Sequence, residues 1–198
     1  MLRVGLTGGL GCGKSLVGAE LERLGCFVIR ADEVGHAVLS PGAEAYSPVL
    51  EAFGPELRNP DGTIDRRKLA ALVFHSSERL AVLNSIVHPA VFRREEQLIS
   101  AAAASGENEI AVVEAAVLIE AGNYRAYDRI VVVTCAEAQQ IERAMKRDGT
   151  TSEAIEARLR HQMPVSEKVK YADFVIDGSG TVEQTLEQTR TVYARLRK

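Results

Sequence analysis

Short apolar runs recur along the chain and alternate with stretches in which apolar residues are spaced three or four positions apart. The second kind of spacing places apolar side chains on one face of a helix. The short runs are nearly continuous, as in parallel strands that are buried on both faces. They cover residues 2–6, 27–29, 110–113, 130–133 and 174–176. Because strands and helices alternate, the pattern predicts an α/β fold with a doubly wound sheet.

The stretch 40–107 breaks this alternation. It contains four of the six prolines and then long helical patterns, within which Pro89 is a fifth, and it shows no convincing strand. We therefore predict a single domain in which a helical lobe at 40–107 is inserted into a core formed by 1–39 and 108–198. A helix is expected to end at Pro89, because a proline disfavours helical geometry in the residue before it.

Two helix ends carry local signals. Gly25 follows an amphipathic segment and is expected to end that helix, since glycine adopts the left-handed conformation of a helix C-terminus at little cost. Thr150 and Glu153 have the spacing of a capping box. This box is expected to open a helix that presents Arg158 and Gln162 on one face.

Composition narrows the function classes. The formal net charge is −3, so the basic excess typical of a nucleic-acid-binding protein is missing. No apolar stretch approaches the roughly 20 residues of a membrane span, and we expect no membrane partner. Cys12, Cys26 and Cys135 show neither a C-x-x-C pair nor zinc-ligand spacing, which favours reduced thiols in a cytoplasmic protein. No pattern in the chain predicts its oligomeric state.

The segment 8–15 matches the phosphate-loop motif G-x-x-x-x-G-K-[ST] and lies between a predicted strand and an amphipathic helix. Glycines let successive backbone N–H groups point at phosphate oxygens, and the helix N-terminus adds its positive dipole end. Lys14 is expected to reach the β- and γ-phosphates of ATP, and Ser15 to offer its hydroxyl to Mg²⁺. For Cys12 the backbone is expected to matter more than the thiol, with a reactive thiol as the alternative. The predicted ATP-binding residues here are Gly8, Gly9, Gly11, Cys12, Gly13, Lys14, Ser15 and Leu16.

Two acidic residues follow predicted strands, and ligands of open α/β sheets bind at the carboxyl ends of the strands. Asp32 could accept or orient the proton of a hydroxyl acceptor, or it could cap the helix that follows. Glu114 could meet Mg²⁺ directly or through water, or it could face solvent. We take Ser15 and Glu114 as the predicted metal ligands. A GTPase is disfavoured, because the chain lacks an N-K-x-D segment for reading guanine.

Arginines gather in the region that follows the fourth predicted strand. Arg143 and Arg147 are four residues apart and share one helix face, and Arg158 lies on the next helix. Guanidinium groups presented in this way can neutralise the charge on a transferring phosphoryl group. Any one of them could instead belong to an ordinary solvated face. The turn 148–150 could allow the two helices to close as a lid.

The ordered set of motifs resembles the dephospho-coenzyme A kinase family over nearly the whole chain. The motifs are 6–15, Ala31-Asp32, His36-Ala-Val38, Asp61-Gly-Thr-Ile-Asp-Arg66, Leu83-Asn84, His88-Pro89, Val117-Leu-Ile-Glu120, Arg147-Asp148, Arg158-x-x-x-Gln162, Ala172-Asp173 and Val175-Ile176. The chain departs from that family's usual Thr, acid, Pro and Asn at Leu16, Arg30, Ala116 and Asp177, respectively. The segment 115–120 is more similar to the kinase domain of the bifunctional eukaryotic coenzyme A synthase.

The resemblance implies a three-layer α/β/α P-loop NTPase fold with a five-stranded parallel sheet, a helical substrate-binding insertion and a helical lid over about 140–170. It also implies ATP- and Mg²⁺-dependent phosphorylation of the ribose 3′-hydroxyl of dephospho-coenzyme A. Two alternatives remain open at this point. One is another small-molecule or nucleotide P-loop kinase, and the other is a regulatory module that binds ATP without turnover.

Individual residues receive roles from the same resemblance. The implied catalytic residues are Asp32 as the base, Lys14 and Arg147. The implied ATP-binding residues outside the phosphate loop are Arg143 and Asp177. The implied acceptor-binding residues are Asp32, His36, His88, Glu120 and Arg158.

Overall fold

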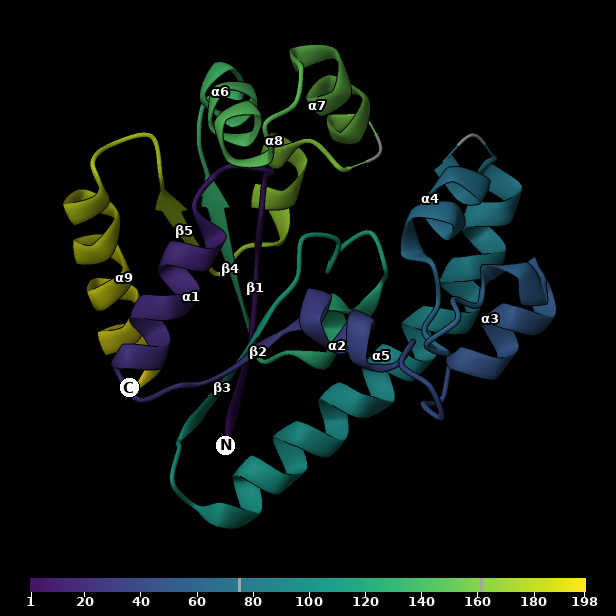
Figure 1. Ribbon diagram of the computed structural model, residues 1–198. Coiled ribbons are helices and arrows are strands. Elements are labelled where there is room, and N and C mark those ends of the chain that lie inside the picture. The colour runs from purple at the N-terminus through teal and green to yellow at the C-terminus, as the bar shows by residue number, and fades with distance from the viewer. Residues whose placement is uncertain (75, 161) are drawn as a thin grey trace. The chain divides into compact units, whose positions relative to one another are not determined.

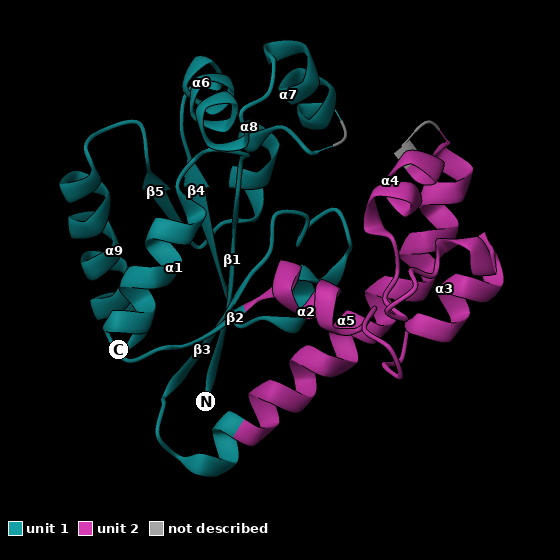
Figure 2. Cartoon of the chain, viewed as in Figure 1, with its two compact units in different colours: residues 1–29, 102–198 teal, residues 30–101 magenta. Residues whose placement is uncertain are grey.

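The computed structural model describes residues 1–74, 76–160 and 162–198. Its chain forms two compact units, shown in different colours in Figure 2. The first unit contains residues 1–29 and 102–198, and the second contains residues 30–101. The helical segment that interrupts the α/β pattern therefore begins about ten residues earlier than the predicted boundary at residue 40, directly at the end of the second strand.

A five-stranded parallel sheet forms the centre of the first unit, as predicted. Its strands are β1 (Leu2–Gly8), β2 (Phe27–Arg30), β3 (Ile110–Glu114), β4 (Arg129–Thr134) and β5 (Phe174–Asp177), in the order β2-β3-β1-β4-β5. Val4 pairs with Val112 of β3, and Gly5 pairs with Ile130 of β4. Strand β1, which leads into the phosphate loop, is thus held between two neighbours and has fixed register on both sides.

Alternate residues of β4 point to opposite faces of the sheet, and each face has its own apolar core. Val131 and Val133 belong to a buried cluster with residues of α1 (Lys14–Arg23) and α9 (Val182–Leu196). These two helices lie side by side in Figure 1. Ile130 and Val132 pack instead against the segment after β3 and the residues around α8 (Val165–Lys168). The sheet is therefore the middle of three layers.

Helix α6 (Glu137–Asp148) and helix α7 (Ser152–Leu159) form a helical pair beyond β4 (Figure 1). The predicted capping residue is wrong by one position: the hydroxyl of Thr151, not Thr150, accepts a hydrogen bond from the Ala154 N–H at 3.4 Å. Helix α7 ends at Leu159, so Gln162 lies beyond it and does not share its face with Arg158. Two short 3₁₀ turns, Asn123–Ala126 and Val169–Tyr171, complete this unit.

Helices dominate the second unit. They are α2 (Ala31–Ala37), α3 (Tyr46–Phe53), a 3₁₀ turn (Pro55–Leu57), α4 (Arg66–Phe74) and α5 (Ser77–Ser105), whose last residues belong to the first unit. The only strand-like pairing described within this unit is an isolated antiparallel bridge between Arg58 and Ile64. Its own apolar core contains Tyr46, Val49, Leu57, Ile64, Leu69 and Val73.

Helix α5 corrects the expectation that a helix ends at Pro89. The helix is 29 residues long and runs through this proline. A proline in a helix interior removes one backbone hydrogen bond and strains the preceding turn, but in a helix of this length the other turns keep their bonds on both sides. None of the described helices, α5 included, is long and apolar enough to cross a membrane.

Candidate active site

The phosphate loop joins β1 to α1, and two of its glycines, Gly8 and Gly11, are required by close backbone contacts. Gly8 has φ 151°, and a Cβ atom there would lie 2.2 Å from the carbonyl oxygen of Val133. Gly11 has φ 73°, and a Cβ atom there would lie 2.7 Å from the carbonyl oxygen of Gln140. A side chain at either position would therefore displace backbone of β4 or α6. The loop geometry expected from the motif is present.

Lys14 begins α1, directly after Gly13, whose left-handed conformation (φ 95°, ψ 20°) turns the chain into the helix. The Lys14 Nζ atom donates to the carbonyl oxygens of Gly9 at 3.2 Å and Gly8 at 3.5 Å. The ammonium group therefore lies against the loop itself. A phosphate held by the loop would compete for this group with two neutral carbonyls, and an anion is the stronger partner for a cation.

Ser15 and Glu114 lie together, although 99 residues separate them. The Ser15 hydroxyl donates to Glu114 Oε1 at 2.8 Å. Glu114 Oε2 is buried and has no hydrogen-bond partner among the residues described. It lies beside Gly18 of α1, where a Cβ atom would come within 2.7 Å of it. Glu114 therefore does not simply face solvent, and Gly18 makes the room for its carboxylate.

These two side chains fit a magnesium ion. Mg²⁺ takes oxygen ligands, and in phosphotransferases it binds one or two protein groups while the phosphates and waters supply the rest. Ser15 Oγ and Glu114 Oε1 provide two neighbouring oxygens at the mouth of the loop. Within 1–74, 76–160 and 162–198, no group of three or more His, Cys, Asp or Glu side chains is placed to hold a metal by itself. A site of this kind would depend on the bound phosphates.

Arg143 and Asp177 converge on the turn that follows β5. The Arg143 guanidinium donates to the Gly178 carbonyl oxygen at 2.7 Å. Asp177 Oδ1 accepts the Ser179 N–H at 2.8 Å, and this bond holds the pKa of Asp177 below its usual value. Both predicted ATP-binding residues therefore shape one turn at the carboxyl edge of the sheet, where a nucleotide base can bind.

Arg147 and Arg158 meet at one carboxylate. Arg147 donates two hydrogen bonds to Asp148, at 2.7 and 3.1 Å, and Arg158 donates one at 2.6 Å. Hydrogen bonds from Arg147 and then Arg158 lower the pKa of Asp148 to about 2, so it is ionised at neutral pH. Two guanidinium groups on different helices are thus held beside each other with a net positive charge. Sequence reasoning placed both arginines in the lid but missed Asp148, which organises them.

Glu120 takes part in a buried network that the sequence did not reveal. The side chain of Lys168 is fully buried, and its ammonium group donates to Glu120 Oε1 at 2.9 Å and to the Ala116 carbonyl oxygen at 2.5 Å. Glu120 Oε1 also accepts the Met163 N–H at 2.9 Å. Lys168 therefore joins α8 to the loop after β3, and Glu120 of that loop also binds the backbone of Met163, which lies between α7 and α8. In this structure Glu120, a predicted acceptor-binding residue, is held in place by its ion pair with Lys168.

Replacing Lys168 by methionine is expected to destabilise the fold by about 3 kcal/mol, since removing one partner of a buried ion pair leaves the other groups desolvated. Chemical denaturation of Lys168→Met against the wild type measures this loss. Lys170→Met is the matched control: it lies two residues away, is 67% exposed, and pairs with Glu167 only at the surface. Its effect should stay within about 0.5 kcal/mol. Equal stability of both variants would show that the buried network contributes nothing.

The second unit carries Asp32, His36 and His88. Asp32 is the second residue of α2 and is exposed, and the helix N-cap is Arg30. The alternative in which Asp32 caps this helix is therefore wrong. His36 lines a cavity of about 490 Å³, whose polar lining also includes Asn59, Thr63, Asp65, Arg66 and Arg67. His88 lies inside α5, not at a helix end, and partial burial lowers its pKa.

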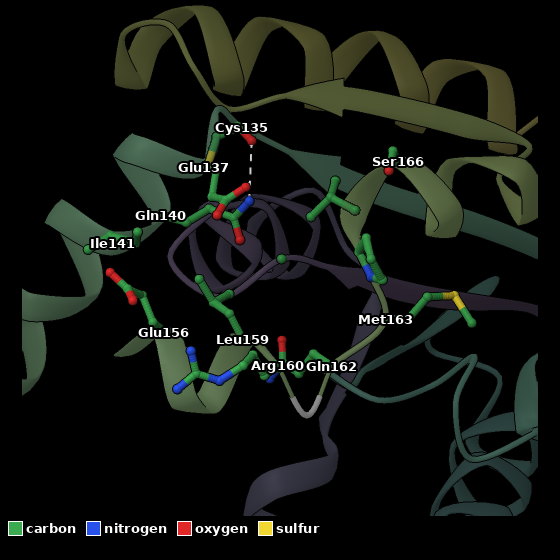
Figure 3. A pocket seen from close by; sticks show the side chains of 13 residues that line it. Cys135, Glu137, Gln140, Ile141, Glu156, Leu159, Arg160, Gln162, Met163 and Ser166 are labelled. Carbon is green, nitrogen blue, oxygen red and sulfur yellow. Dashed lines mark hydrogen bonds between the residues drawn. The ribbon is translucent and has the colours of Figure 1, made fainter. Parts of the chain in front are cut away.

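A second cavity of about 490 Å³ lies in the first unit and is lined by residues of α6, α7 and the segment that leads into α8 (Figure 3). Cys135, Gln140 and Arg160 are among the residues that line it. Of the predicted ATP-binding residues, Gly9 is the only one among the lining residues that the structure describes. The Gln140 side chain donates to the Cys135 carbonyl oxygen at 3.4 Å, as the dashed line in Figure 3 shows. This cavity therefore reaches the phosphate loop at Gly9.

Comparison with solved structures supports this architecture. A Thermus thermophilus protein of known crystal structure is 32% identical and superimposes with a TM-score of 0.82 over 98% of this chain and 97% of that one. The dephospho-CoA kinase from Campylobacter jejuni is 25% identical, with a TM-score of 0.73 over 98% and 96%. A shikimate kinase from Bacteroides thetaiotaomicron, 11% identical with a TM-score of 0.55 over 100% and 99%, shares the fold alone.

Sequence comparison is more specific. The dephospho-CoA kinase of Aquifex aeolicus is 41% identical over 196 residues, which cover 99% of this chain and 98% of that protein. The dephospho-CoA kinase of Carboxydothermus hydrogenoformans is 43% identical over 189 residues, which cover 96% and 91%. The family model described as dephospho-CoA kinase matches residues 2–184. With the phosphate loop and its surrounding geometry in place, this chain belongs to the dephospho-CoA kinase family.

Proposed function

We propose that this protein transfers the γ-phosphoryl group of ATP to the ribose 3′-hydroxyl of dephospho-coenzyme A and releases coenzyme A and ADP. The observation that carries the proposal is the phosphate loop of a family member, with the Lys14 ammonium against it and the Ser15 hydroxyl bonded to Glu114. Loop N–H groups, a lysine and a magnesium-binding hydroxyl are the parts that P-loop kinases use on a triphosphate.

The first unit would hold the nucleotide. The glycine N–H groups and Lys14 would bind the β- and γ-phosphates, and Arg143 and Asp177 would shape the turn that receives the adenine. Ser15 and Glu114 would hold Mg²⁺, which when bound would neutralise charge on the phosphate oxygens. The support for this arrangement is the convergence of all these side chains on loops at the carboxyl edge of one parallel sheet.

Asp32 is proposed as the residue that accepts the proton of the attacking hydroxyl. It follows the last residue of β2 by two positions and is exposed rather than used in a helix cap. A positioned carboxylate contributes to phosphoryl transfer by orienting the acceptor hydroxyl and taking its proton. The rest of residues 30–101, with the polar cavity lined by His36, is proposed to hold the acceptor.

The helical pair α6–α7 is proposed as a lid over about 140–170. Its joint is Gly149, in the left-handed conformation at φ 61°, and Asp148 beside it keeps Arg147 and Arg158 together. Closure would bring both guanidinium groups onto the charge that spreads over the transferring oxygens and would exclude water. Asp148 would thus keep the two cations in place before the substrates arrive.

The test is an acceptor panel with the purified full-length protein and MgATP. Dephospho-coenzyme A, adenosine, shikimate and gluconate are supplied in turn, with one reaction without acceptor, and ADP and phosphorylated products are measured by liquid chromatography and mass spectrometry. We expect coenzyme A and ADP in equal amounts with dephospho-coenzyme A alone, and fragmentation of the product should locate the new phosphate on the 3′ oxygen. ADP formation that does not depend on dephospho-coenzyme A would refute the proposal.

A further inference from the structure

Two cysteines from distant parts of the chain meet at the phosphate loop. Cys12 lies inside the loop, and Cys135 directly follows β4. Their Sγ atoms are 2.9 Å apart. A disulfide requires the sulfurs to come to about 2.05 Å with suitably placed Cβ atoms. The two thiols are therefore already neighbours, in a part of the fold where β4 and the loop are fixed against each other.

The two thiols differ in access and in chemical character. Cys12 is 0% exposed, whereas Cys135 is only partly buried and lines the cavity that α6 and α7 also line (Figure 3). The hydrogen bond with Cys12 lowers the pKa of Cys135, and the nearby Arg143 and Lys14 cations lower it further against the effect of burial. The same hydrogen bond and burial raise the pKa of Cys12. Because thiolates are the reactive form, Cys135 is the thiol that an oxidant meets first.

We propose that Cys135 and Cys12 form a redox-sensitive pair, in which oxidation by a peroxide closes a reversible disulfide across the phosphate loop and turns the kinase off. The Cys135 thiolate attacks one peroxide oxygen, the O–O bond breaks, and a sulfenic acid forms with release of hydroxide. The Cys12 sulfur then attacks the sulfenic sulfur, its proton leaves with the hydroxyl group as water, and the S–S bond forms. Two thiols are oxidised and one peroxide is reduced, and a dithiol reductant reverses the change.

The disulfide would act on the phosphate loop, because one of its two cysteines, Cys12, is part of that loop. Closing the gap from 2.9 Å to a bond shortens it by about 0.9 Å. The Cys12 carbonyl oxygen packs against Gly178, where a Cβ atom would lie at 2.3 Å, and the Cys12 N–H donates to the Gly9 carbonyl oxygen at 3.3 Å. A shift of Cys12 therefore disturbs both the N–H groups of the loop and the turn after β5. Misplacement of about 1 Å in a catalytic site can cost about 10²-fold in rate.

Disulfide formation is tested on the full-length protein by intact mass and peptide mapping after treatment with hydrogen peroxide. The wild type should lose the mass of two hydrogen atoms and yield a peptide that joins Cys12 to Cys135. Cys12→Ser should stop at a sulfenic acid on Cys135, trapped by a cyclic dione, and Cys135→Ser should form neither product. Cys26→Ala is the control that keeps the reactive pair. A wild type that accumulates the sulfenic acid without the cross-link, or a cross-link that includes Cys26, would overturn the proposal.

The effect on function rests on the proposed ATP-dependent activity, so MgATP binding is measured beside turnover. Oxidised wild type should bind MgATP more weakly and lose about 10²-fold in kcat/KM, and dithiothreitol should restore both. Because linkage is reciprocal, saturating MgATP should favour the dithiol by the factor by which the disulfide weakens MgATP binding. Unchanged MgATP affinity and turnover in cross-linked protein would overturn the switch. A wrong acceptor would leave the mass and MgATP-binding results intact, so the two failures are distinguishable.

Discussion

Replacing Lys14 by alanine is expected to lower kcat/KM for ATP by about 10²–10³-fold, the cost of removing one preorganised group that stabilises transition-state charge. In the structure the ammonium group donates to two neutral carbonyl oxygens of its own loop, at 3.2 and 3.5 Å. These contacts are long and weak beside a charge-assisted bond to phosphate. The largest part of the lysine's effect should therefore appear in turnover, not in folding.

Steady-state kinetics and thermal unfolding of the same preparations separate the two effects. Lys14→Ala should unfold within a few degrees of the wild type, because Lys14 is the first residue of α1 and half-buried. Lys170→Ala removes the same charge from an exposed surface pair and should keep wild-type turnover. A folded Lys14→Ala protein with near wild-type kcat/KM would show that Lys14 does not act on the triphosphate. It would also contradict the assignment of this loop as the triphosphate-binding site.

The sheet and the phosphate loop could be predicted from the sequence because their signals are local. Strands buried on both faces must be continuously apolar, and each such run became a strand of the sheet. Gly8, Gly11 and Gly13 follow from the same reasoning, since positive φ and close backbone approach both select glycine. At these positions the residue type alone indicates the backbone conformation or the burial of the strand.

Local signals were misleading where the rest of the fold decides. Pro89 ends a helix when only its neighbours are considered, but α5 continues through it for the rest of its 29 residues. The observed N-cap of α7 is one residue later than the predicted one. Thr150 and Thr151 carry the same hydroxyl group, so the sequence does not show which of them caps the helix. Gln162 was placed on α7 by its spacing from Arg158, but the helix had already ended at Leu159.

Contacts between distant segments could not be predicted from spacing at all. Gly18 resembles any helix glycine until the Glu114 carboxylate is seen beside it. Lys168 looks like a surface lysine in sequence, yet its side chain is fully buried. Its ammonium group contacts Glu120 and the Ala116 carbonyl oxygen in the loop after β3. Cys12 and Cys135 showed no pattern because 123 residues separate them. Each case depends on which loops meet at the carboxyl edge of the sheet, a property of strand order rather than of sequence interval.

Replacing Asp32 by asparagine is expected to lower kcat by about 10²–10⁴-fold, the usual contribution of general-base help, while MgATP affinity stays close to that of the wild type. Asparagine keeps the size and a hydrogen-bonding oxygen but cannot accept a proton. The fold should tolerate the change, because Asp32 is exposed and caps no helix. Loss of a carboxylate from the first turn of α2 costs at most about 1 kcal/mol through the helix dipole.

Glu33→Gln separates the proposed proton acceptance from this electrostatic effect. Glu33 is the next residue, lies in the same first turn of α2 and is also exposed, so its amide variant loses the same charge at nearly the same place. If Asp32 is the base, Asp32→Asn loses kcat and Glu33→Gln retains it, with equal thermal stability in both. Equal losses in the two variants would mean that the charge of this turn matters and that no single carboxylate takes the proton. A kcat for Asp32→Asn within about fivefold of the wild type would instead leave positioning and charge neutralisation at the phosphate loop to account for the rate.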